Sequence, residues 1–216
     1  MLLVSNSATD PYFSSRVSIA NLNTNLTDAK GKVWTANGNA NVSGGWLNLD
    51  GTGDYLATPN STDFDFAAGD FALEAFINLA VTPGAEMTIA SKWQSGSLSW
   101  LFGINASRRV FLYTRIAGTN RFSTGTNTVT VGADAHIAAY RVSSLWYVAI
   151  NGVVQSILTN AGSIEVTSQQ TCIGTQSDGS MNAFNGKVRG FRATKGGAGG
   201  YGATNFTPPS FPLPTS

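Results

Sequence analysis

Several residue types are scarce in this sequence, and each scarcity excludes a class of protein. The chain contains one cysteine, Cys172, so it cannot form an internal disulfide. One histidine, His136, beside that single cysteine is too little for a structural zinc site. Lys and Arg number 13 and Asp and Glu 12, and this balance gives no electrostatic basis for binding nucleic acid or an anionic membrane. No apolar run approaches the roughly 18 residues of a membrane-spanning helix, so membrane insertion is not expected.

The composition and the spacing of apolar residues favour an all-β fold. Charged residues make up only 12 % of the chain, about half the usual share, and polarity comes mainly from Ser, Thr and Asn. Apolar residues recur at every second position in 71–79, 98–104 and 145–150, whereas no window keeps a helical period over three turns. Asn151–Gly152 between two apolar runs is the pattern of a tight β-hairpin.

The remaining apolar runs are short and regularly spaced, which is typical of a sandwich or barrel. They predict further strands at 16–22, 32–36, 45–50, 54–58, 87–93, 109–115, 121–124, 135–142, 171–175 and 184–194. The faces of the longest strands predict a core between two sheets that contains Leu73, Ile77, Trp100, Phe102, Trp146 and Val148.

The two ends of the chain differ from the middle. Residues 1–15 show no clear alternation and are expected to form an arm, with the sandwich at 16–206. Residues 207–216 hold most of the seven prolines and are expected to run extended. Phe206, Phe211 and Leu213 supply apolar anchors, either to strap the tail across its own sandwich or to contact a neighbouring subunit.

A set of segments carries a family resemblance: 50–56 (DGTGDYL), 69–76 (GDFALEAF), 135–141 (AHIAAYR), 148–153 (VAINGV), 184–196 (FNGKVRGFRATKG) and 205–209 (NFTPP). Together they resemble the LamG-like branch of the concanavalin A-like lectin/glucanase superfamily, in the form common in tailed-phage and prophage virion proteins. The resemblance covers about 10–212 and implies a two-sheet antiparallel jelly roll.

Enzymes of this superfamily that cut glucans share a strand motif of Glu-x-Asp-x-x-Glu type, because retaining glycoside hydrolysis needs two nearby carboxylates. Here Glu74 is the sole acidic residue of its predicted strand, and no other predicted strand carries a spaced acidic pair. His136 has no Gly-x-Ser-x-Gly partner motif, so it is expected to be structural, like Cys172. We therefore expect a protein that is not an enzyme, with a glycoside hydrolase as the disfavoured third option.

Calcium is the one cofactor that the resemblance raises, because many relatives of the fold bind it. Asp50 and Asp54 flank a Gly-rich turn and, with Asp178, are candidate oxygen ligands. Relatives often carry an acidic residue after the Asn-Gly-aromatic run of the final strand, where this chain has Arg189 and Gly190. No cofactor is expected, and a loop-borne calcium site remains the alternative.

Carbohydrate recognition needs an aromatic platform with amide or carboxylate groups beside it. The candidate residues are Trp93, Tyr113, Tyr147 and Tyr201, with Phe122 as a further aromatic. Each has a plain alternative, since aromatic residues at alternate strand positions usually belong to the core.

The sequence thus predicts a structural protein on the surface of a tailed-phage particle, as a head decoration, a fibre or a tail-tip component. The expected partners are other virion proteins, including copies of itself, with assembly in the bacterial cytoplasm, where a lone thiol stays reduced. The alternative is a lectin-like module that binds host-surface glycans. Both functions are compatible in one protein.

Overall fold

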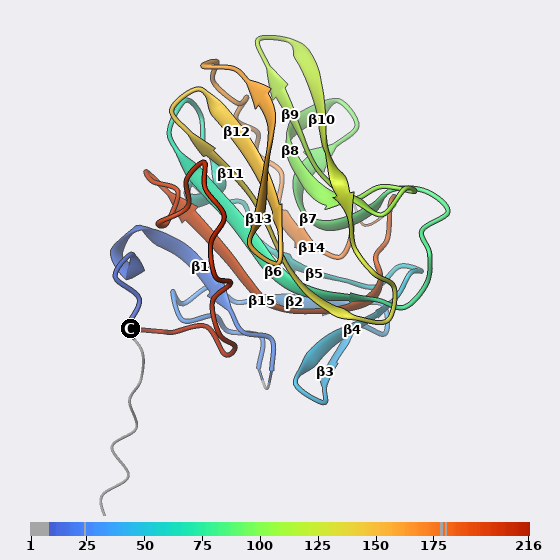
Figure 1. Cartoon of the computed structure of the whole chain (residues 1–216). Coiled ribbons are helices and arrows are strands. Elements are labelled where there is room, and N and C mark those ends of the chain that lie inside the picture. Colours follow the sequence, from blue (N-terminus) through green and yellow to red (C-terminus); the bar gives the residue numbers. More distant parts are fainter. Residues whose placement is uncertain (1–8, 24, 178, 180) are drawn as a thin grey trace, which may run out of the picture.

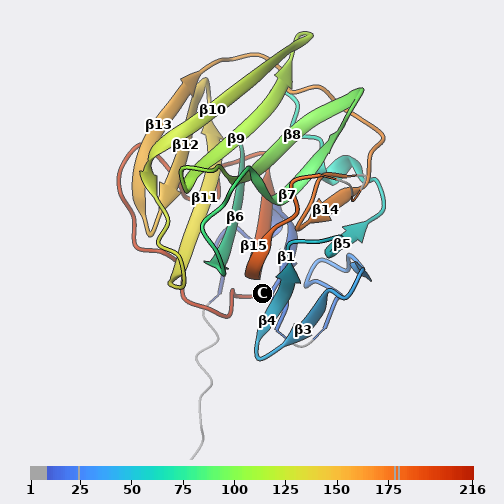
Figure 2. The same cartoon turned by 90° about the vertical axis from the view of Figure 1, so that its right-hand side faces the viewer.

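The computed structural model describes residues 9–23, 25–177, 179 and 181–216, and these form two antiparallel β-sheets packed face to face (Figures 1 and 2). The expected all-β jelly roll is confirmed. The eight-stranded sheet contains, in spatial order, β13 (Val153–Thr159), β12 (Leu145–Ile150), β11 (Asp134–Val142), β6 (Phe71–Leu79), β15 (Asn185–Lys195), β4 (Trp46–Asp50) and β3 (Asn41–Ser43), and β1 (Arg16–Ala20) also pairs with β15.

The seven-stranded sheet contains β10 (Thr119–Thr128), β9 (Arg109–Ile116), β8 (Ser97–Ile104), β7 (Met87–Gln94), β14 (Thr171–Ile173), β5 (Tyr55–Thr58) and β2 (Thr35–Asn37). Two single 3-10 turns, Phe13–Ser15 and Thr62–Phe64, are the helical elements of the described residues. Neither approaches the length and apolar character of a membrane span.

The core lies between the two sheets, because every second side chain of each strand points toward the opposite sheet. All six predicted core residues are buried there: Leu73, Ile77, Trp100, Phe102, Trp146 and Val148. The indole N–H groups of the two tryptophans donate to backbone oxygens, Trp100 to Phe64 at 2.9 Å and Trp146 to Asn160 at 2.7 Å. The predicted hairpin is also present, since both Asn151 (φ 49°) and Gly152 (φ 79°) have the positive φ of a type I′ turn.

The structure corrects the prediction for one strand face. The spacing of apolar residues in 98–104 puts Leu98 on the same face as Trp100, but a register shift opposite Lys92 and Trp93 inserts an extra residue into β8. Leu98 therefore packs with Trp93 on the outer face of the seven-stranded sheet. The strand β3 was also not among the predicted runs, whereas β13 was implied as the second strand of the predicted hairpin.

The C-terminal segment lies along the outer face of the eight-stranded sheet (Figure 1). The Phe206 N–H donates to the Gly152 oxygen at 3.0 Å, and Phe211 meets Phe76 edge-to-face with ring centres 5.8 Å apart. Leu213 is 2 % exposed, and its backbone exchanges two hydrogen bonds with the Asn21 amide. All three predicted anchors thus contact the chain's own sandwich, and a role for them in assembly stays a prediction.

Candidate functional site

A groove of about 530 Å³ lies on the outer face of the seven-stranded sheet, and we call it the aromatic groove. It brings together Trp93 and Tyr113, two of the residues predicted for carbohydrate binding, with Phe122. Its remaining lining residues are apolar or uncharged except for one carboxylate: Glu86, Ser95, Gly96, Leu98, Leu101, Asn120, Gln176 and Met181.

Strand alternation and the β8 bulge build this groove. On β9, Val110 and Leu112 point into the core, so Phe111 and Tyr113 point outward and stack with ring centres 4.1 Å apart. Phe122 on β10 meets Tyr113 edge-to-face at 4.8 Å and is 63 % exposed. The groove therefore has an aromatic floor with one ring that is open to solvent.

The polar edge of the groove is centred on Glu86. The Tyr113 hydroxyl donates to Glu86 Oε1 at 2.6 Å, and Asn182 Nδ2 donates to Glu86 Oε2 at 3.4 Å. Burial, together with this carboxylate, raises the pKa of Tyr113 well above its usual value, so the hydroxyl stays protonated as a donor. Nothing in the local sequence marked Glu86, because its partner Tyr113 lies 27 residues away.

The other two predicted aromatics lie on the opposite side of the sandwich. Tyr140 stands between Tyr147 and Tyr201, with ring centres at 5.3 and 5.2 Å, and Phe206 covers Tyr201 at 4.5 Å. The C-terminal segment thus closes over this cluster, which leaves Tyr147 only 5 % exposed. Tyr147 and Tyr201 thus hold the tail to the sheet and do not join the groove, and a role for them in carbohydrate binding stays a prediction.

Glu74 lies beside this cluster in a buried ionic network. Its carboxylate accepts hydrogen bonds from His136 Nε2 at 3.0 Å, from Arg192 Nε at 2.7 Å and from the Tyr201 hydroxyl. Burial alone would raise the pKa of Glu74, but His136 and Arg192 lower it to about 2. At 1 % exposure Glu74 presents no surface to a substrate.

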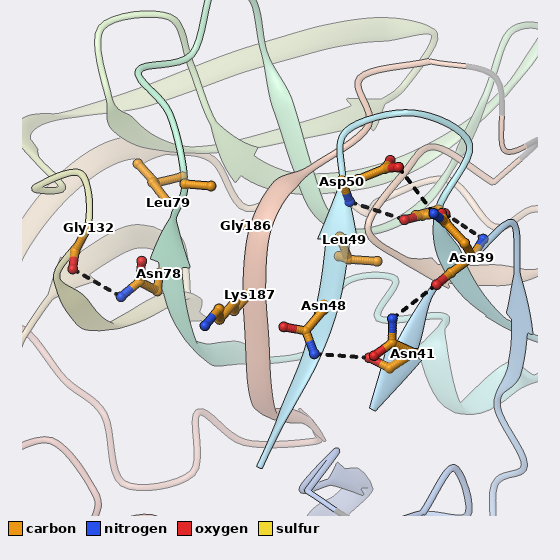
Figure 3. Close-up of a pocket in the computed structure, with 12 residues that line it drawn as sticks. Asn39, Asn41, Asn48, Leu49, Asp50, Asn78, Leu79, Gly132, Gly186 and Lys187 are labelled. Atoms are coloured by element: carbon orange, nitrogen blue, oxygen red, sulfur yellow. Dashed lines mark hydrogen bonds between the residues drawn. The ribbon is translucent and has the colours of Figure 1, made fainter. Parts of the chain in front are cut away.

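Asp50 and Asp54 line a second hollow, of about 350 Å³, which we call the amide pocket (Figure 3). Asp54 accepts hydrogen bonds from the backbone N–H groups of Asn39 at 2.8 Å and Asp50 at 3.1 Å, and Asp50 accepts one from Thr52 at 2.7 Å. Both carboxylates thereby hold loop backbone.

The third predicted ligand, Asp178, lies outside the described residues, which contain no cluster of three His, Cys, Asp or Glu side chains. A calcium site stays a prediction.

The sequence and the fold of this chain are similar to those of known proteins. Residues 50–196 match the family described as the concanavalin A-like lectin/glucanases superfamily. The chain belongs to this superfamily. No curated protein matches it.

Several solved structures share the superfamily fold at low identity. They include one titled "Crystal structure of HCR/D-Sa-GBL1/C" (TM-score 0.65, 14 % identity, covering 85 % of this chain and 48 % of that one). Another is the binding domain of Paraclostridial Mosquitocidal Protein 1 (TM-score 0.61, 10 % identity, 85 % and 49 %). A third is domain 4 of AbnA, an extracellular arabinanase from Geobacillus stearothermophilus, in complex with arabinotriose (TM-score 0.57, 15 % identity, 84 % and 93 %). The chain spans about half the length of the first two, and these likenesses show the fold alone.

Proposed function

We propose that this chain is a non-enzymatic glycan-binding domain on the surface of a tailed-phage or prophage particle, where it attaches the particle to host glycans. The observation that carries the proposal is the aromatic groove, because it combines one open aromatic ring with directed hydrogen-bonding groups. Pockets of this kind bind small molecules by apolar contact and fix their orientation with a few polar groups.

The groove supplies both contacts that a sugar ring needs. The open ring of Phe122 offers a face on which the C–H side of a pyranose packs, while Glu86 accepts hydroxyl protons. Asn120 Oδ1 accepts from Arg115 at 2.8 Å, which orients its amide N–H₂ as a donor. The groove has no Lys or Arg among its described lining residues, which favours uncharged sugars.

Two further observations support the proposal. One concerns the absence of catalysis, and the other concerns whether the fold can hold an oligosaccharide. Glu74, the acidic residue of β6, is enclosed by His136, Arg192 and Tyr201. The arabinanase domain with the same fold was solved with arabinotriose. A sandwich of this type thus accommodates an oligosaccharide.

The particle setting rests on the sequence resemblance over 10–212, which is to domains of virion proteins. In this setting the domain is a head decoration, a fibre or a tail-tip component, with other virion proteins and copies of itself as partners. The buried thiol of Cys172 is compatible with assembly in the bacterial cytoplasm. Negative-stain images of purified particles labelled with an antibody to this chain test the setting, and unlabelled particles would contradict it.

Binding itself is tested with the purified chain on a broad glycan array, followed by titration of the best ligand. Phe122→Ala should weaken binding by about tenfold, since exposed aromatics at a binding site commonly contribute this much. Val153→Ala is the matched control, because Val153 is also an exposed apolar strand residue but lies on the other sheet. Absence of any ligand, or equal affinity for Phe122→Ala and wild type, would refute the groove assignment.

A further inference from the structure

Five polar residues form a straight row across the outer face of the eight-stranded sheet, and we call it the polar row. They are directly paired in register from β3 to β11: Asn41, Asn48, Lys187, Asn78 and Asp134. Since adjacent strands lie about 4.8 Å apart, the row is about 19 Å long. Four of its members line or border the amide pocket, where Figure 3 shows them on neighbouring ribbons.

The two central asparagines have fixed orientations. Asn48 Nδ2 donates to the backbone oxygens of Asn41 and Ser43, both at 3.3 Å, and Asn78 Nδ2 donates to that of Gly132 at 3.2 Å. Backbone oxygens only accept hydrogen bonds, so these contacts decide which end of each amide is the N–H₂ group. Both Oδ1 atoms are left as acceptors with no hydrogen bond in the part of the chain that the structure describes.

Lys187 stands between these two acceptors. It is exposed and makes no ion pair or hydrogen bond with any described residue. The three neighbouring carboxylates have other partners: Asp134 pairs with Arg189 at 3.3 Å, Asp54 accepts backbone N–H groups, and Asp50 accepts the Thr52 N–H at 2.7 Å. The ammonium group therefore remains available to an anion from outside the chain.

The centre of the row thus presents an acceptor, a cation and an acceptor at strand spacing. The complementary ligand has an anionic group flanked by hydroxyl donors on a compact ring. A carboxylated sugar has this pattern, because its carboxylate can take a charge-assisted hydrogen bond from Lys187 while its hydroxyls donate to the two amide oxygens.

We propose that the amide pocket binds a carboxylated saccharide, with Lys187 on the carboxylate and Asn48 and Asn78 on the hydroxyls. This site lies on a different sheet from the aromatic groove and does not depend on it. A chain with both sites would bind a glycan through an uncharged unit at one and an acidic unit at the other.

The test is a titration of ¹⁵N-labelled protein with digalacturonate and with its methyl ester, which has the same rings without the charge. Digalacturonate should shift the side-chain amide signals of Asn48 and Asn78, and the ester should bind at least about tenfold more weakly, as expected for loss of a charge-assisted hydrogen bond. Acetate tests the carboxylate alone, and an equal response to acetate would overturn the saccharide assignment.

Variants separate this site from a general charge effect. Lys187→Gln should weaken digalacturonate binding by about tenfold, whereas Arg109→Gln makes the same charge change at an exposed residue of the other sheet and should leave it unchanged. Phe122→Ala should also leave it unchanged, so that failure of the aromatic groove and failure of the amide pocket are distinguishable. Equal binding of acid and ester, unshifted Asn48 and Asn78 signals, or wild-type affinity in Lys187→Gln would each overturn the proposal.

Discussion

Replacing Glu74 with Gln should destabilise the fold strongly at neutral pH. Glu74 is 1 % exposed and accepts hydrogen bonds from His136, Arg192 and Tyr201. The substitution leaves the buried Arg192 guanidinium without its closest carboxylate. Removing one partner of a buried ion pair typically costs about 3–5 kcal/mol, so we expect a loss of this size in the free energy of unfolding.

The same network predicts how this contribution depends on pH. The pKa of Glu74 is about 2 in the folded protein against an ordinary value of 4.5, a difference equivalent to about 3 kcal/mol. Because the folded pKa is lowered, the contribution is complete above pH 4.5 and is lost as the pH falls toward 2. At pH 3 roughly 2 kcal/mol of it should already be gone.

Urea melts of wild type and Glu74→Gln at pH 7 and pH 3 measure both effects, because the difference between the two proteins isolates Glu74 from the other acids. Glu165→Gln is the control, since Glu165 is 41 % exposed and lies 3.7 Å from Arg115, a surface pair worth less than about 1 kcal/mol. A Glu74→Gln cost no larger than that of Glu165→Gln, or an equal cost at both pH values, would refute the reasoning.

Three further outcomes are expected. Trp146→Ala should lower the free energy of unfolding by about 3–5 kcal/mol through the cavity it leaves, and a change below about 1 kcal/mol in urea melts would contradict its core position. Deleting residues 207–216 should lower the melting temperature, because it removes buried Leu213; an unchanged melting temperature with loss from purified particles would instead indicate an anchor to a neighbour. The purified chain should release no reducing sugar from a broad panel of glycans, and release that disappears in Glu74→Gln would show catalysis.

Local alternation explains how much of the fold the sequence predicts. The predicted strands 71–79 and 145–150 coincide with β6 and β12, because each carries an unbroken period of two and ends at a turn signal. Leu98 was misplaced because a bulge reverses the faces without leaving a mark in the pattern. The short strand β3 has a single inward apolar residue, Val42, which is too little to define a period.

The candidate sites depend on contacts between distant segments, and these were only partly predictable. Trp93 and Tyr113 were identified as candidate aromatics for a sugar platform, but Glu86 was not, since only the fold brings it to Tyr113. Tyr147 is a strand tyrosine like Tyr113, and what separates the two is the tail that covers Tyr147. The polar row is invisible in the sequence because it is set by the register of five strands.

The outer surfaces of the sandwich differ in how many of their polar groups already have partners within the chain. This difference supports the positions proposed for the two ligand sites. Beneath the C-terminal segment, the Glu74 carboxylate accepts hydrogen bonds from His136 and Arg192, and all three side chains are buried away from a partner. Where the segment is absent, Phe122 keeps an open ring, and Lys187 has no ion pair or hydrogen bond among the described residues. A saccharide bound as proposed would gain contacts there without breaking any that the described residues make with one another.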